Sequence, residues 1–131
     1  MKWFQRGRQR LLQRTEGATA VEFAIILPVF LLFVFGIIDF GNVYFQLYMV
    51  NEASREGARV ATVGGTLQTV TTTVQNFGSN FQVSMTPSPP VSGQNVTVTV
   101  TNSVQIFTPL IRAFFPNNPY TVTGRSVMRV E

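Results

Sequence analysis

The hydrophobic positions of this sequence form one long run near its beginning and a regular alternation near its end. From residue 18 to 38 the sequence reads ATAVEFAIILPVFLLFVFGII, in which Glu22 is the single charged residue. A helix of these 21 residues rises about 30 Å, the thickness of the hydrocarbon core of a bilayer. Phe23–Ile38 lacks the polar face that a helix of a small soluble domain needs. The run therefore predicts a transmembrane helix.

The helical spacing continues past Ile38 through residues 41–63, where apolar side chains recur every three or four positions. Within this stem, Ala53, Gly57 and Ala61 are four residues apart and give the helix one smooth face. Small side chains allow another backbone to approach closely. The face predicts packing either against another subunit or against a sheet of the same chain, and the sequence leaves both alternatives open.

Residues 64–131 predict a small α+β domain. Gly64-Gly65 is expected to end the long helix, as glycines commonly do. The apolar positions of residues 63–77 keep a helical period and predict a second short helix, although threonine is frequent there and lowers helix propensity. Alternating positions predict strands at Phe81–Thr86, Asn95–Val104 and Tyr120–Val130. An antiparallel sheet of three or four strands is marginal alone at this length, so we expect it to pack on the long helix.

An apolar segment, residues 106–115, separates the last two predicted strands and is bounded by Pro109 and Pro116. Its large side chains are Phe107, Leu110, Ile111, Phe114 and Phe115. They can cover the sheet, or they can touch lipid or a partner. Of these roles we expect the first, as part of the domain core.

Charge separates the first 17 residues from the remainder of the chain. Residues 1–17 hold five Lys/Arg and one acidic residue, whereas the other 114 residues hold five of each sign. The net charge of +4 therefore belongs to this leader, and the neutral body excludes a basic nucleic-acid-binding face. Because cations stay on the cytoplasmic side of a membrane helix, residues 1–17 are predicted to be cytoplasmic and the bulk of the chain to be exported.

The composition also excludes most catalytic chemistry. The chain has no His and no Cys, and only 12% of its residues are charged. It therefore lacks the usual zinc ligands, a thiol nucleophile and a histidine base. We expect no enzymatic activity, no metal and no cofactor.

The sequence around the start of the apolar run is TEGATAVEF, residues 15–23. An ordinary secretory signal fits poorly, because the apolar run is too long and no Ala-x-Ala follows it. The segment resembles a type IV prepilin cleavage site, with a basic leader ending in Gly17, an apolar helix beginning at Ala18, and Glu22 as its fifth residue. Residues 17–61 are similar to the TadE family of pilus-assembly pseudopilins. The features that carry this similarity are Glu22, Leu27-Pro28, the cluster of Gly36, Asp39 and Gly41, and the REGAR element at Arg55–Arg59.

The resemblance implies a pilin-like architecture, with a long N-terminal helix half in the membrane and half under a small antiparallel sheet. It further implies that a prepilin peptidase cuts between Gly17 and Ala18, and that Glu22 is an assembly contact pairing with the new N-terminal amine of a neighbouring subunit. The implied role is that of a minor pilin or pseudopilin in assembly of a tight-adherence (type IVc, Flp-type) pilus. Its partners would be other pilins and the pilus assembly platform.

These features divide the chain into four parts: a basic cytoplasmic leader (1–17), a transmembrane helix (18–40), a helical stem (41–63) and a small exported domain (64–131). Two alternatives stay open at the level of single residues. Glu22 can be an interfacial carboxylate that simply stays hydrated, and Asp39, at the readily solvated far edge of the run, can be a polar anchor. For the whole chain, the alternative is an unprocessed single-pass anchor whose exported domain binds an envelope partner or ligand.

Overall fold

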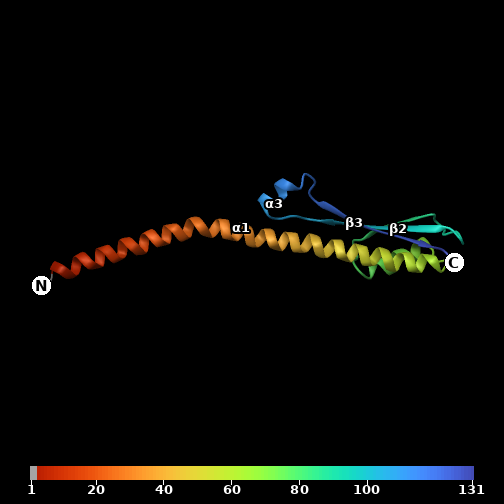
Figure 1. Cartoon of the computed structure of the whole chain (residues 1–131), viewed down its shortest axis with the longest axis horizontal. Helices are drawn as coiled ribbons and strands as arrows, with labels where there is room; N and C mark the ends of the chain where they lie inside the picture. The colour runs from red at the N-terminus through yellow and green to blue at the C-terminus, as the bar shows by residue number, and fades with distance from the viewer. Residues whose placement is uncertain (1–2) are drawn as a thin grey trace.

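The computed structural model describes the backbone of residues 3–131 and the side chains of residues 17–131. One long helix, α1 (Trp3–Thr62), forms the axis of the molecule, and every other described element lies along its C-terminal half (Figure 1). In chain order these elements are α2 (Leu67–Gln75), β1 (Gln82–Thr86), β2 (Asn95–Val104), α3 (Pro109–Phe114) and β3 (Tyr120–Arg129). The predicted α+β architecture is confirmed.

The three strands form one antiparallel sheet in the order β1-β2-β3. Central β2 pairs with β1 from Gln82 opposite Thr101. On its other side β2 pairs with β3 along its whole length, from Asn95 opposite Arg129 to Val104 opposite Tyr120. The bounds of β2 are those predicted, because alternating valine and threonine suits a strand with one buried and one solvated face.

The hydrophobic core lies between one face of the sheet, α2 and the C-terminal part of α1. Its fully buried side chains include Val50, Ala53, Ala58, Ala61, Val70, Val74, Val96, Val98 and Val100. Helix α1 and strand β3 lie in close contact at Gly124, where an added Cβ would overlap the carbonyl oxygen of Val50 and lie 2.7 Å from the nitrogen of Asn51. The absence of a side chain at Gly124 therefore lets the backbone of the strand lie against the backbone of the helix.

Helix α1 ends as predicted, since Gly64 adopts a positive φ of 83° and the N–H of Gly65 bonds the carbonyl of Val60. The following helix, α2, forms despite its threonines because their hydroxyls bond backbone carbonyls one turn earlier. The donors are Thr71, Thr72 and Thr73, and the acceptors are the carbonyls of Leu67, Gln68 and Thr69. The hydroxyl of Thr66 caps the first turn.

The predicted core role of residues 106–115 is wrong for most of the segment. Its residues Phe107, Leu110 and Phe114 are 77%, 50% and 76% exposed. Instead of covering the sheet, the segment leaves β2, forms α3 beside the middle of α1 and returns to β3 (Figure 1). We call residues 105–119 the α3 excursion. Composition cannot distinguish a core segment from one that faces lipid or a partner, because both are apolar.

Candidate functional site

The residues of the implied processing site lie in the first described turns of α1. Ala18 and Glu22 are both exposed, and since they are one helical turn apart they share a face of α1. Gly17 has open space around it, with nothing within 4 Å of an added Cβ. Among residues 17–131, no cation pairs with Glu22. The cations of the predicted leader lie outside the residues whose side chains are described.

The apolar part of α1 is exposed along its length. Within the part of the chain whose side chains are described, Gly17–Thr62 is the single helix long and apolar enough to cross a membrane. Only 6% of its most apolar window is buried inside the molecule, whereas the core helix of a soluble protein is mostly buried. The molecule is therefore compatible with a single-pass membrane protein. Uncovered aromatic side chains continue beyond the apolar run at Phe40, Tyr44 and Tyr48, four residues apart.

The small-residue face of the stem is used within the chain. Ala53 and Ala61 are fully buried in the core beneath the sheet and α2. A Cβ at Gly57 would lie 3.0 Å from Val74 and 3.2 Å from Val98, so both α2 and β2 approach the helix here. Of the two alternatives that the sequence left open, the structure shows the second: this face packs against the sheet of its own chain. The stem also carries two ion pairs, Glu52–Arg55 and Glu56–Arg59, on its exposed sides.

Asp39 joins α1 to the α3 excursion. Its Oδ2 accepts hydrogen bonds from the backbone N–H groups of Phe107, at 3.1 Å, and Thr108, at 2.7 Å. The residue is only 5% exposed, so the alternative of a polar anchor that is readily solvated at the edge of the apolar run does not hold. Helix α1 also continues through this position, and the carboxylate holds a segment almost seventy residues away in sequence.

A second set of contacts closes the α3 excursion at its base. The Oδ1 of Asn118 accepts from the N–H of Ile106 at 3.2 Å, and its Nδ2 donates to the Ile106 carbonyl at 3.5 Å. The rings of Phe115 and Tyr120 meet edge to face, with centroids 4.9 Å apart. Sequence analysis missed α3, although Thr108-Pro109 is a helix-start signal, with the proline in the first turn.

The candidate residues do not converge on one cavity. Glu22 and Gly57 both belong to α1, and at 1.5 Å per residue they are roughly 50 Å apart along its axis. In the described part of the chain, no group of three or more His, Cys, Asp or Glu residues could hold a metal ion. What the arrangement offers chemically is a long apolar helical surface with one carboxylate near its beginning.

Comparison with protein families identifies this same helix. Residues 17–59 match the family model described as TadE-like protein. This segment is TadE-like. The resemblance inferred from the sequence is thereby confirmed over residues 17–59, which include Glu22, Asp39 and the REGAR element. The TadE-like segment begins at Gly17 and ends within the stem of α1, so it contains the apolar run and the first residues that pack on the sheet. The comparisons with curated proteins and with solved structures gave no match.

Proposed function

We propose that this protein is a minor pilin or pseudopilin that takes part in assembly of a tight-adherence (type IVc, Flp-type) pilus. A prepilin peptidase removes residues 1–17 by cutting between Gly17 and Ala18. The mature chain stays in the cytoplasmic membrane, with its sheet domain outside, until it joins other pilins at the assembly platform. It has no catalytic activity of its own and needs no cofactor.

The observation that carries this proposal is the start of the TadE-like match at Gly17, the residue at which a prepilin leader would end. Membership of that segment in a TadE-like family supports a role in Tad pilus assembly. The exposed apolar surface of α1 is compatible with this role, because it leaves the helix free to contact lipid or other helices.

The position of Glu22 supports a role in assembly. A carboxylate in a membrane helix costs up to about 2.5–3.5 kcal/mol at the helix centre and less near the interface. Cleavage after Gly17 would create a positive amine on Ala18, and a neighbouring subunit could present this amine to Glu22. Pairing of the two charges would compensate for the cost of the carboxylate in lipid.

The cleavage step is tested by measuring the intact mass and N-terminal sequence of the membrane-extracted protein, with and without the cognate peptidase. We expect a chain that starts at Ala18 only when the peptidase is present. Gly17→Val should abolish this cut, while Gly41→Val should leave it unchanged. The two substitutions are matched in side chain, and neither glycine has an atom within 4 Å of an added Cβ.

The assembly contact is tested with Glu22→Ala, for which we expect normal membrane insertion and cleavage but impaired piliation. Glu52→Ala serves as the control, because it removes a carboxylate of the same helix that lies outside the REGAR element and pairs with Arg55 on the exposed stem. Normal piliation with Glu22→Ala would exclude the proposed pairing.

The second candidate function is a single-pass anchor whose exported domain binds an envelope partner or ligand. The observation that favours it is the apolar, exposed surface of the α3 excursion, which the core does not use and which in this case would face the partner instead of lipid. A full-length chain that keeps its leader beside an active peptidase would favour the anchor over the pilin.

A further inference from the structure

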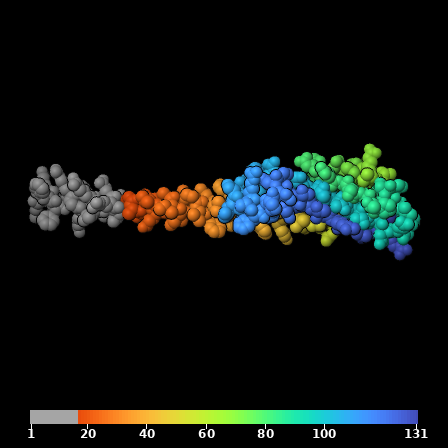
Figure 2. Space-filling model, turned by 90° about the horizontal axis from the view of Figure 1, so that it is seen from above, coloured from red at the N-terminus to blue at the C-terminus, as the bar shows by residue number. Residues whose placement is uncertain are grey.

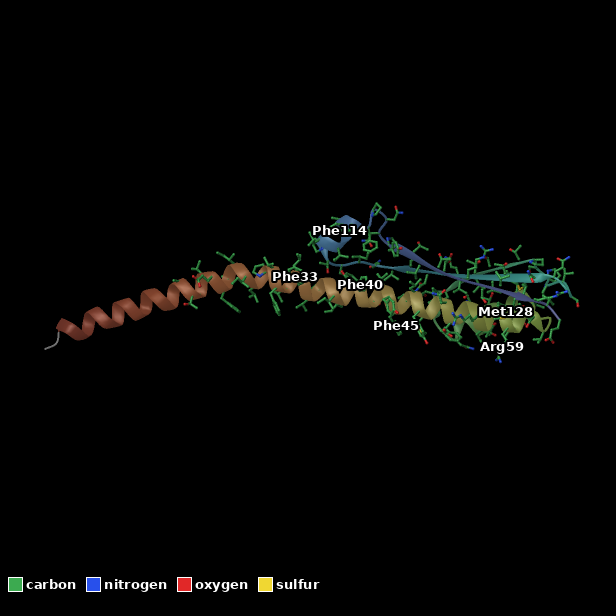
Figure 3. All side chains as sticks on the ribbon, in the orientation of Figure 1. Phe33, Phe40, Phe45, Arg59, Phe114 and Met128 are labelled. Atoms are coloured by element: carbon green, nitrogen blue, oxygen red, sulfur yellow. The ribbon has the colours of Figure 1, made fainter. Side chains whose placement is uncertain are left out.

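The α3 excursion presents large apolar side chains on the outside of the molecule. Phe107, Leu110 and Phe114 are exposed, while Ile111 points inward and lies 3.4 Å from the Cβ position of Gly36. Figure 3 shows Phe114 at α3, over the part of α1 between Phe33 and Phe40. In the space-filling view the excursion covers α1 at this level, and the sheet lies further along the rod (Figure 2).

Several contacts hold these exposed side chains in place. The carboxylate of Asp39 binds the excursion before α3, and the amide of Asn118 closes it after α3. The edge-to-face contact of Phe115 with Tyr120 fixes its return to β3. The exposed apolar surface therefore belongs to a fixed element of the fold. Exposed apolar patches of this kind mark a surface that contacts lipid or another molecule.

The level of α3 along α1 places it within the apolar run. Gly36, which Ile111 contacts, is two residues, or about 3 Å of helix rise, inside the end of that run at Ile38. An apolar groove of about 420 Å³ lies between the two segments and reaches as deep as Leu32. It is lined by Leu32, Phe35, Ile38, Asp39, Phe107, Thr108 and Pro109. If residues 18–38 span the hydrocarbon, an element at the level of Gly36 is inside it as well.

Several backbone N–H groups of the excursion are already paired, which lowers the cost of a hydrocarbon environment, where unpaired N–H groups are costly. The N–H groups of Ile106, Phe107 and Thr108 donate to the side chains of Asn118 and Asp39. Those of Arg112 and Phe115 donate to carbonyls within the excursion. Three prolines, at positions 109, 116 and 119, bring no N–H at all.

The charge of the excursion also fits the edge of a bilayer. Arg112 is the only charged residue between positions 105 and 119, and it is exposed. Long cationic side chains on apolar elements extend their charged ends to the lipid phosphates. Through the groove, the exposed surface of α3 adjoins α1 at half-buried Leu32 and exposed Phe35.

We propose that the α3 excursion inserts into the membrane leaflet on the side of the sheet domain, where Phe107, Leu110 and Phe114 contact acyl chains. Lipid fills the groove beside Asp39, and Arg112 reaches the phosphates. The protein is thus held to the bilayer by two elements, the spanning helix and the inserted excursion. This inference rests on the membrane insertion of α1 and is independent of cleavage or pilus assembly.

Because the chain has no cysteine, single spin labels can be placed without removing native thiols. We would label Phe114→Cys and Leu110→Cys in the full chain reconstituted in phosphatidylcholine–phosphatidylglycerol vesicles. Accessibility to oxygen, which concentrates in lipid, would be compared with accessibility to a water-soluble nickel chelate. The controls are Ile26→Cys on the spanning helix and Val127→Cys on the sheet. All four side chains are at least half exposed, so labelling leaves the core intact.

We expect oxygen to be favoured over the chelate at positions 110 and 114, as at position 26 but less strongly because α3 lies nearer the edge of the apolar run, and the label at position 127 to show the reverse preference. Chelate-favoured values at 110 and 114, with position 26 in lipid, would overturn the inference alone. Labels at 110 and 114 shielded from both reagents, with spin–spin broadening, would show that a second copy covers α3 instead of lipid. A water-exposed label at position 26 would overturn the insertion of α1 together with that of α3.

Discussion

Replacing Asp39 with alanine is expected to release the α3 excursion from α1 while the sheet stays folded. The substitution removes the acceptor of two backbone hydrogen bonds, at 3.1 Å from Phe107 and 2.7 Å from Thr108. Hydrogen bonds to a charged group contribute about 1.5–3 kcal/mol each. Counting the longer bond at the low end, the local free energy of opening should fall by about 3–5 kcal/mol. Core contacts between the sheet and α1 do not involve Asp39.

The assay is amide hydrogen exchange in detergent micelles, because exchange reports local opening separately from global unfolding. The reporter is the N–H of Ile106, which keeps its own acceptor in Asn118. A change of 1.4 kcal/mol is tenfold in an equilibrium constant, so a loss of about 3 kcal/mol speeds exchange about 100-fold. We expect an increase of at least this size at Ile106, with the amide of Val98 in β2 unchanged.

The control variant is Glu56→Ala, which removes a carboxylate from an exposed ion pair of the same helix and should leave both amides unchanged. Asp39→Asn, which retains one oxygen acceptor without its charge, should give an intermediate rate. Exchange at Ile106 that changes less than threefold in Asp39→Ala would refute the reasoning. In that case the excursion would be held by Asn118 and the aromatic contact, with Asp39 contributing little.

Two further predictions concern the packing and surface of the stem. Gly124→Ala places a Cβ against the backbone of Val50, which cannot move aside as a flexible side chain could. The substitution should lower the free energy of unfolding, measured by denaturant titration, by about 1–3 kcal/mol or more. Gly41→Ala, at a position with open space around it, should leave the stability unchanged or raise it by up to about 1 kcal/mol. Equal effects of Gly124→Ala and Gly41→Ala would contradict the close approach of β3 to α1. Glu56→Gln breaks the exposed ion pair with Arg59 and should change the free energy of unfolding by less than about 1 kcal/mol. This difference should disappear in 1 M salt, which screens exposed charges. A larger loss of stability that salt does not remove would argue against a solvated pair.

The regular elements were predictable because local pattern and tertiary role agree in them. In β2, valine and threonine alternate without exception between Val96 and Thr101, and the structure buries the valines while the threonines stay partly exposed. The end of α1 follows from Gly64, whose positive φ favours a residue without a side chain. Both signals lie within a few residues of the structure that they specify.

The α3 excursion could not be placed from the sequence, because the contacts that position it are specific to the tertiary structure. Asp39 accepts from backbone N–H groups, which every residue except proline has. The side chains at positions 107 and 108 therefore give no indication that this segment binds Asp39. The small-residue face at Gly57 gave an ambiguous signal for a similar reason. A smooth helical face admits any closely approaching backbone or side chain, and here it received Val70, Val74 and Val98 of the same chain.

The uncovered surface of α1 limits how this helix can ever leave a membrane. Between residues 21 and 38, twelve large apolar side chains are exposed, each by more than a third of its surface. Moving such a set from lipid into water would cost on the order of 10–20 kcal/mol, at roughly 1–2 kcal/mol for each side chain that is only partly uncovered. Spontaneous escape through an aqueous intermediate is therefore negligible. Extraction therefore requires a direct transfer, in which the apolar helix moves from the acyl chains to another protein surface without exposure to water.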